Sequence, residues 1–325
     1  MEQEVIHSEV DQLSHHDGKP KREKNFKWRK HLVHLFLLPA VLIYGVFQFY
    51  PLMSAVINSL YSWNGFDRDS FIGLQNFITL LTEKPHNNTF LNAFKHNWTY
   101  FFVNVFSELM IAYFLALIIN SRIKGREFFK TVFFLPKMLS VIVIGFLFSL
   151  ILNPTTGALN TLLRALGLDF LAHPWLGSTD TALMTIILVN SWAGIGFSML
   201  IFLASLQAVD KEIFDAAKID GAYGWKMLTK ITIPMTMNAI MVMTILTFIG
   251  SFETFELIYA MQGSSGGPYY STDVLGTYFY RLAFGSADGG QSIGLGSAVA
   301  VILFMIIACA TAILLFYFKK KDFQR

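Results

Sequence analysis

Cysteine and charged residues are both scarce in this sequence. Its 325 residues include one cysteine, and 14% of them are charged, against about 25% in an average soluble domain. A lone cysteine excludes a disulfide framework and a cysteine-based zinc cluster. The net charge of +3 is too small, and the basic residues too scattered, for a nucleic-acid-binding stripe. The composition therefore argues against an ordinary soluble protein.

Motifs for nucleotide and metal chemistry are missing as well. The sequence contains no G-x-x-x-x-G-K-[ST] phosphate loop, and none of its eight histidines forms an H-E-x-x-H pair. No nucleophile stands beside a base in a recognisable motif. This disfavours a membrane enzyme, and any ATP-driven process would need another polypeptide.

Apolar segments of more than twenty residues dominate the chain. Hydrophobic residues make up 54% of it and gather in stretches long enough to cross a hydrocarbon core of about 30 Å. Six segments are expected to span a membrane: 32–60, 97–120, 127–152, 181–209, 235–261 and 292–318. Pro39, Pro51 and Pro136 lie inside them and are expected to bend or break their helices. The predicted fold class is an all-α polytopic membrane protein with about six transmembrane helices.

Basic residues determine the expected orientation, because cytoplasmic loops retain positive charge. Nineteen lysines and arginines fall in the N-terminal segment, the even-numbered loops and the tail, against five in the odd-numbered loops. Both termini are therefore expected in the cytoplasm, and Lys137 is expected to reach the headgroups from the third span. The N-terminal segment does not resemble a cleavable signal peptide. The expected organisation is a polar, basic extension over 1–31, a transmembrane domain over 32–318 and a basic tail over 319–325.

The loop between the fourth and fifth spans, 210–234, is longer than a simple turn requires. Asp210 can cap a first helix, with Glu212 near its positive end, and Gly221 can stop that helix in a left-handed conformation. A second helix would then present Tyr223 and Trp225 at the membrane surface. The pattern predicts a helix, a turn and another helix that a groove on a partner protein could receive.

The same loop resembles the signature loop of ABC importer permeases, E-A-A-x-x-x-G followed by nine residues and I-x-L-P. The matching residues are Asp215, Ala216, Ala217, Gly221, Ile231, Ile233 and Pro234, with Asp215 in place of Glu and Ile233 in place of Leu. In the family this loop docks into a cleft of a cytoplasmic ATPase. The resemblance therefore implies that ATPase coupling depends on Asp215, Ala216, Ala217, Gly221, Ala222, Tyr223 and Trp225. The alternative, which needs no such spacing, is an amphipathic hairpin lying on lipid.

Further motifs resemble the maltose and glycerol-phosphate branch of these permeases. Residues 71–77 follow the branch pattern F-x-G-L-x-N-[FY]. Later in the chain come, in order, Ser251-Phe-Glu, Gly266-Gly-Pro268, Ser271-Thr272, Tyr280-Arg281 and Gly294-Leu-Gly-Ser-Ala298. The resemblance covers about 36–318 and departs from the branch in an extra glycine-rich stretch, 285–291. It implies the MetI-like type I importer fold and a carbohydrate cargo, with a non-sugar solute as the alternative.

The resemblance also implies partners. The permease would pair with a homologous second permease, with a heterodimer favoured and a homodimer left open. Two ATPase subunits and an extracytoplasmic solute-binding protein would complete the importer. ATP and Mg²⁺ would bind to the ATPases, so no cofactor, metal or catalytic residue is expected in this chain. Transport would proceed by alternating access in a bacterial inner membrane.

Polar residues inside the spans are candidates for the transport path, because exposing them to lipid is costly. Amide and carboxylate groups bind sugar hydroxyls, and aromatic faces pack on sugar C–H groups. The candidates are Asn104, Asn190, Trp192, Glu253 and Tyr259, and the hypothesis is that Asn190 and Trp192 face the path. The alternative role for these residues is a contact between helices, except that Glu253, near the external end of the fifth span, would instead reach water.

An ion-coupled secondary transporter is the main rival. Such a protein usually carries intramembrane carboxylates, discontinuous helices and a repeat between its halves. Here Glu108 is the only carboxylate well inside a predicted span, and the two halves do not visibly repeat. This rival leaves the loop 210–234 unexplained. Among carbohydrates, the sequence leaves open mono-, di- and oligosaccharides, acidic sugars and glycerol phosphate.

Overall fold

The computed structural model describes residues 36–65, 67–121, 123–285 and 291–322. The predicted extension 1–31 and the tail residues 323–325 lie outside these ranges, as do residues 286–290 of the glycine-rich stretch. The chain divides into two units, Met1–Ser54 and Ala55–Arg325, which are described separately.

In the first unit the described residues belong to a helix that spans Phe36–Asn58 and so continues into the second unit. No residue in its most apolar stretch is buried within the protein. Such exposure is expected of a helix that faces lipid or another subunit. The helix continues through Pro39 and Pro51. A π-helical turn, η1 (Gly45–Phe49), precedes α3 (Tyr50–Asn58), and of the bend or break expected at Pro51 no break occurs.

In the second unit three helical segments are long and apolar enough to cross a membrane, and two bent pairs add further candidates. The first segment, His86–Asn120, consists of α5 (His86–Asn104), η2 (Val105–Met110) and α6 (Ile111–Asn120). The others are α10 (Ala182–Gln207) and most of α17 (Ile293–Asp322). In the first bent pair, α7 (Arg126–Phe134) and η3 (Leu135–Met138) meet α8 (Val141–Ile151) at 96°. In the second, the segment Gly224–Met235 meets α14 (Met237–Glu253) at 70°.

The number of candidate spans agrees with the prediction, but their ends differ. With each bent pair counted as one span, the described residues hold up to six. The break predicted at Pro136 is confirmed, since this proline lies in the 3₁₀ turn η3 beside the first bend. The fifth span predicted over 235–261 is wrong as one helix. Its helix α14 stops at Glu253, where Thr254 has a ψ of 124°, and α15 (Glu256–Gln262) follows as a separate helix.

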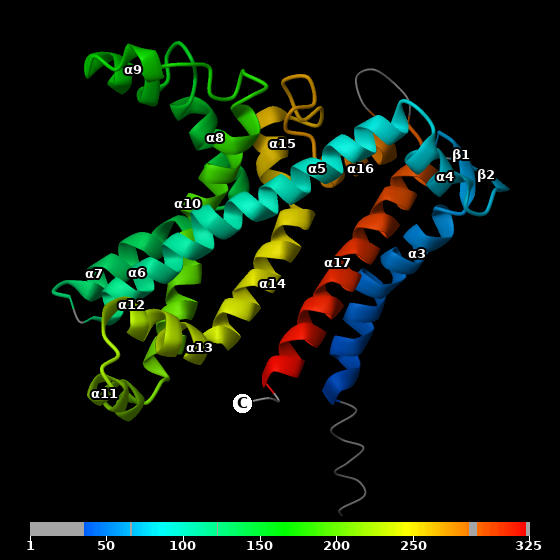
Figure 1. Cartoon of the computed structure of the whole chain (residues 1–325). Helices are drawn as coiled ribbons and strands as arrows, with labels where there is room; N and C mark the ends of the chain where they lie inside the picture. Colours follow the sequence, from blue (N-terminus) through cyan, green and yellow to red (C-terminus); the bar gives the residue numbers. More distant parts are fainter. Residues whose placement is uncertain (1–35, 66, 122, 286–290, 323–325) are drawn as a thin grey trace, which may run out of the picture. The chain divides into compact units, whose positions relative to one another are not determined.

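Short elements lie at both ends of the second unit (Figure 1). At one end are the strands β1 (Tyr61–Asn64) and β2 (Asp67–Phe71), the helices α4 (Gln75–Thr82), α9 (Ala158–Ala165) and α16 (Leu275–Phe284), the turn η4 (Asp169–Leu171), and α15. The strands pair antiparallel with Trp63 opposite Arg68 and add a hairpin to the predicted all-α class. At the other end are α11 (Lys211–Ile219), α12 (Gly224–Met227), η5 (Leu228–Thr232) and α13 (Ile233–Met235). Loop 210–234 thus lies opposite the odd-numbered loops, as the charge distribution predicted.

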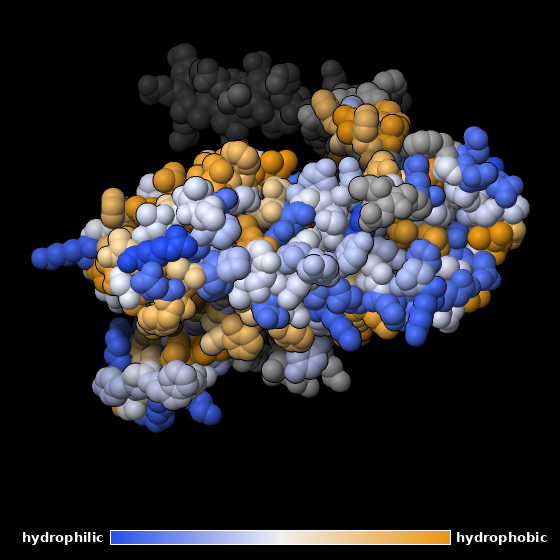
Figure 2. All heavy atoms as spheres, turned by 90° about the horizontal axis from the view of Figure 1, so that it is seen from above, coloured by the Kyte–Doolittle hydropathy of each residue, from blue (hydrophilic) through white to orange (hydrophobic). Residues whose placement is uncertain are grey.

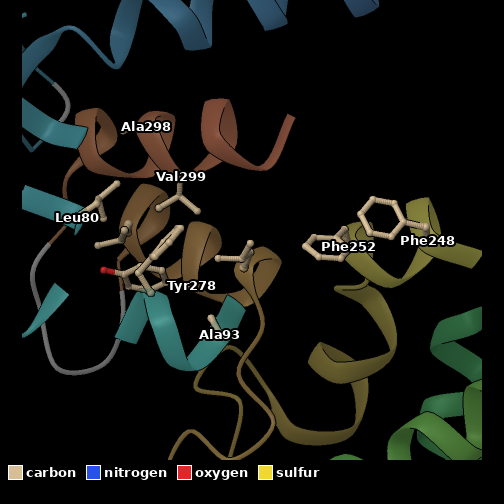
Figure 3. Close-up of a cluster of buried hydrophobic side chains, with 10 residues drawn as sticks. Leu80, Ala93, Phe248, Phe252, Tyr278, Ala298 and Val299 are labelled. Carbon is tan, nitrogen blue, oxygen red and sulfur yellow. The ribbon is translucent and has the colours of Figure 1, made fainter. Parts of the chain in front are cut away.

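Helices distant in the sequence meet in a buried hydrophobic core (Figure 3). Its members include Leu80 of α4, Ala93 of α5, Phe248 and Phe252 of α14, Tyr278 of α16, and Ala298 and Val299 of α17. Beside this core, the fully buried Asn97 on α5 donates to Ser251 O of α14 at 2.8 Å and accepts from Leu275 N of α16 at 2.9 Å. Because a buried amide is stable only when its hydrogen bonds are made, Asn97 holds these three helices in one arrangement.

Many large apolar side chains are exposed on the chain, among them Phe106, Ile142, Phe146 and Phe316. Figure 2 shows hydrophobic patches exposed along several edges of the view from above, between hydrophilic residues that lie at its left and right ends and over part of its centre. A surface of this kind suits lipid and neighbouring subunits better than water.

Candidate functional site

Loop 210–234 begins with the predicted helix, but without the predicted cap. Asp210 occupies the N-cap position of α11 in an extended conformation, yet its side chain makes no capping hydrogen bond. The capping contact predicted from the sequence is therefore wrong. What remains favourable is the charge of Asp210 and Glu212 at the positive end of the helix.

The turn at Gly221 is confirmed in detail. Gly221 has a φ of +74°, in the left-handed region that favours glycine. Its N–H donates to Lys218 O at 3.0 Å, and Ala222 N–H donates to Ala217 O at 2.8 Å. These two bonds form the Schellman motif that ends a helix. Ala217 and Ala222 are both buried, so the turn between α11 and α12 is held in one geometry.

The predicted coupling residues separate into a buried pair and an exposed set. Ala217 and Ala222 are the buried pair, whereas Asp215, Ala216, Gly221, Tyr223 and Trp225 are exposed. Asp215 accepts a hydrogen bond from Lys218 Nζ at 2.7 Å on the open surface. Tyr223 is 67% exposed and Trp225 77%, and Ile219, which the motif did not single out, is 88% exposed. Three large apolar side chains therefore project from one short loop.

A cavity of about 250 Å³ lies within the second unit. It is lined by Asn104, Glu108, Lys137, Leu139, Val141, Ile144, Asn190, Ala193, Gly194, Phe197, Met243, Leu246, Thr247, Gly250, Ser251 and Leu257. Of the predicted path residues it brings together Asn104 and Asn190. Trp192, Glu253 and Tyr259 do not line it. Two residues after Asn190 on the same helix, Trp192 points about 200° away.

The polar wall of the cavity is held by hydrogen bonds between α10 and the segment around η2. Ser198 Oγ donates to Glu108 Oε1 at 2.7 Å, and Ser191 Oγ donates to Asn104 Oδ1 at 2.9 Å. Gly194 makes room for the carboxylate, since a Cβ there would lie 2.5 Å from Glu108 Cδ. Glu108 itself lies in the π-helical turn η2, a departure from α-geometry that is frequent at functional sites.

Lys137 is the lining residue whose position differs from the prediction. It was expected to reach the headgroups from the third span. Instead it lies on η3 beside the 96° bend and lines the cavity, with Nζ 5.9 Å from the centroid of the Phe197 ring. The sequence alone could not indicate this, because the direction of the side chain depends on the bend.

The remaining path candidates lie in aromatic contacts or on the surface. The ring centroid of Trp192 is 5.2 Å from that of Phe148 on α8. Tyr259 of α15 packs on Tyr280 of α16 with centroids 5.4 Å apart. Glu253 is exposed at the end of α14. These contacts agree with helix packing for Trp192 and Tyr259, and their role in transport stays a prediction.

The external segment before α16 is fixed by a buried ion pair. Arg281 Nη2 lies 2.6 Å from Asp273 Oδ2, and Nη1 lies 2.8 Å from Oδ1, with the two residues 9% and 0% exposed. Arg281 also donates to Ser264 O at 2.9 Å, and Thr277 donates to Asp273 Oδ1 at 2.5 Å. Gly266 must be glycine here, because a Cβ would lie 2.6 Å from Asp273 Cα. This network connects the loop 263–274 to α16.

A phenol beside this ion pair stays protonated. Tyr278 Oη lies 3.1 Å from His86 Nδ1, which connects α16 to the start of α5. Burial raises the pKa of the Tyr278 phenol well above its usual value. The phenol is therefore neutral at physiological pH.

Within the described ranges, no group of three or more His, Cys, Asp or Glu side chains is placed to hold a metal ion.

The family of this chain follows from comparison with known proteins. The family model described as the binding-protein-dependent transport system inner membrane component matches residues 108–321, and the chain belongs to this family. It is a multi-pass inner-membrane permease of an ABC transport system, which excludes the ion-coupled secondary transporter.

Relatives are similar over nearly the whole chain. The probable ABC transporter permease protein YurN of Bacillus subtilis (strain 168) is 34% identical over 89% of this chain and 97% of its own length. The arabinooligosaccharides transport system permease protein AraP of the same organism is 32% identical, with coverages of 90% and 92%. A crystal structure of a bacterial ABC transporter involved in import of the acidic polysaccharide alginate matches with a TM-score of 0.74. The match covers 90% of this chain and 96% of that chain at 24% identity, and it shows that the two chains share a fold.

Proposed function

We propose that this chain forms half of the translocation path of a carbohydrate importer. A homologous second permease forms the other half, so that the two chains make a heterodimer. An extracytoplasmic binding protein delivers the cargo, and two cytoplasmic ATPases, which hold ATP and Mg²⁺, supply the energy. The observation that carries the ATPase assignment is the exposure of Ile219, Tyr223 and Trp225 on a rigid loop in a permease of this family. The carbohydrate assignment is supported by relatives such as the arabinooligosaccharide permease.

The path from the loop to the cavity is continuous along the chain. Of the exposed residues, Ile219 lies on α11, Trp225 lies on α12, and Tyr223 is the N-cap of α12. From there α12, η5 and α13 lead into α14 across the 70° bend. Met243, Leu246, Thr247 and Gly250 of α14 line the cavity. When the ATPases close, the docked loop moves, and α14 transmits that movement to the cavity wall. This gives alternating access with no chemical step in this chain.

The proposed organisation keeps the sequence-based boundaries. The extension 1–31 and the tail 319–325 lie on the cytoplasmic side of the transmembrane domain 32–318. Exposed apolar residues of α8, including Val141, Ile142 and Phe146, would contact the second permease or lipid.

Purification of the assembled importer tests the proposed function. A tagged chain solubilised from native membranes is expected to retain an ATPase and a second permease, identified by mass spectrometry. Trp225→Ala is expected to weaken ATPase retention by roughly thirtyfold, because a buried interface tryptophan is worth about 2 kcal/mol or more. Phe170→Ala, which removes a 79% exposed ring at the opposite end of the second unit, is the matched control. Recovery of the chain without any ATPase would refute the proposal.

Asn190 and Trp192 test the path assignment separately. Asn190→Ala is expected to lower uptake about fivefold at subsaturating cargo, the value of one hydrogen bond of about 1 kcal/mol. Trp192→Ala removes a ring that packs on Phe148 outside the cavity and is expected to affect stability more than cargo affinity. Uptake would be measured in proteoliposomes with normal ATP hydrolysis as the control. Unchanged uptake by Asn190→Ala would remove Asn190 from the path.

A further inference from the structure

The cavity contains one acid and one base whose roles the family assignment does not explain. Glu108 lies on η2 and Lys137 on η3, so two irregular segments bring opposite charges to the same cavity. Among the residues that the structure describes, no salt bridge joins Glu108 to Lys137. Glu108 takes its hydrogen bond from Ser198 Oγ, and Lys137 Nζ lies over the Phe197 ring. Each therefore keeps hydrogen-bonding capacity for a cargo.

The surroundings of Glu108 are built to hold its carboxylate at the cavity. Ser198 engages Oε1 and leaves Oε2 without a hydrogen bond from the described side chains. Gly194, also a lining residue, is the position where any side chain would collide with the carboxylate. An ionised carboxylate accepts hydrogen bonds and donates none, so its natural cargo partners are hydroxyl groups.

From this arrangement we propose that Glu108 and Lys137 set the charge selectivity of the path, so that it favours neutral saccharides over saccharides that carry carboxylate or phosphate groups. This inference rests on the proposed carbohydrate transport. In the proposed arrangement Glu108 is a carboxylate and Lys137 an ammonium, so the cavity carries no net charge and a neutral cargo preserves that balance. An acidic cargo adds a second negative charge beside Glu108, where low dielectric strengthens repulsion. Lys137 limits this penalty without removing it.

The proposal predicts an order of selectivity among variants. Glu108→Gln leaves Lys137 as the only charge, so it is expected to improve binding of an acidic saccharide at least about tenfold relative to a neutral one. The amide oxygen of the new side chain can still accept from Ser198. Lys137→Met leaves Glu108 alone and is expected to shift the preference in the opposite direction. The ratio of neutral to acidic binding thus falls from Lys137→Met through wild type to Glu108→Gln.

Saturation-transfer NMR on the detergent-purified permease and ATPase complex, without the binding protein, measures this ratio. The probes are maltotriose and trigalacturonate at equal millimolar concentration. The matched controls are Glu127→Gln and Lys130→Met, the same substitutions in an exposed ion pair of 3.0 Å on α7, outside the cavity. They are expected to behave as wild type.

The possible results separate the inference from the proposed function. An unchanged ratio in both cavity variants, an equal signal for both saccharides in wild type, or no saccharide signal in wild type would overturn the selectivity inference. ATP-dependent uptake of saccharides by wild-type proteoliposomes with a binding protein is measured in parallel. Failure of that uptake across a panel of neutral and acidic saccharides would instead refute the proposed carbohydrate function.

Discussion

Replacing Gly221 with valine is expected to abolish ATP-driven uptake while the chain still inserts and folds. Gly221 has a φ of +74°, and an L-residue in this region costs roughly 1–2 kcal/mol, with a β-branched side chain at the upper end. The space around the missing Cβ is open, so the effect comes from backbone strain and not from a collision. A free-energy cost of about 1.4 kcal/mol lowers the population of a conformation tenfold relative to its competitors. The docking geometry of the loop therefore becomes a minor conformation.

Backbone strain at Gly221 would change the angle between α11 and the exposed side chains proposed to dock on the ATPase. The Schellman bonds of Gly221 and Ala222 hold the exposed Tyr223 and Trp225 at a fixed angle to α11. Under the proposed coupling, a change in that angle would prevent ATPase closure from moving α14. The measurement is uptake together with ATP hydrolysis in proteoliposomes, and the expected signature is hydrolysis without uptake or loss of stimulation by the loaded binding protein.

A second variant at the same position separates strain from contact. Gly221→Asn adds a side chain to the loop but tolerates the left-handed conformation, so it is expected to retain most of the uptake. Normal uptake by Gly221→Val, with the complex intact, would refute the assignment of this loop to ATPase docking. Equal loss by both variants would show that added volume, and not backbone conformation, is what the interface rejects.

Replacing Arg281 with methionine is expected to destabilise the external end of the second unit strongly. The change leaves the carboxylate of Asp273, which is 0% exposed, without its bidentate partner. Breaking a buried ion pair by removing one partner costs about 3–5 kcal/mol. Arg281 also holds Ser264 O, so the loop 263–274 loses a second connection to α16. Thermal unfolding of the purified complex is expected to shift down by roughly 6–20 °C.

A rescue experiment identifies the cause of this loss. Removing both charges, in the double variant Asp273→Leu with Arg281→Met, is expected to recover much of the stability, because no unpaired buried charge remains. Arg68→Met replaces an exposed guanidinium at the same end of the unit and is expected to have little effect. If Arg281→Met and Arg68→Met have the same unfolding temperature, the ion pair contributes little to stability. If the double variant is no better than the single one, the loss comes from packing and not from charge.

Loop 210–234 shows how far local chemistry could predict the structure. The left-handed turn at Gly221 and the helices on either side follow from residues within a few positions of one another, and the structure contains them. The capping hydrogen bond assigned to Asp210 was wrong. Asp210 has the extended backbone conformation of an N-cap residue, but that conformation does not require its side chain to accept a hydrogen bond from the helix. The spans were predicted for the same local reason, since apolar length is a property of the continuous chain.

The cavity shows the limit of such reasoning. Glu108 and Ser198 are 90 residues apart, and they meet only because α10 packs against η2 and α6. The same helix directs Asn190 into the cavity and Trp192 away from it, a distinction that composition and polarity do not contain. Lys137 enters the cavity because the chain bends by 96° after η3, and the predicted fifth span ends early because Thr254 leaves the helix.

The amino-acid sequence determined the class, the number of candidate spans and the helix, turn and helix of loop 210–234. The reason is that apolar length, charge distribution and turn preference act over short stretches of chain. Packing between distant helices decided which polar groups meet at the cavity, where the bent spans end, and how Asp273 and Arg281 pair beneath the external surface. Those contacts depend on distances between side chains far apart in the chain, and no pattern of neighbouring residues encodes them.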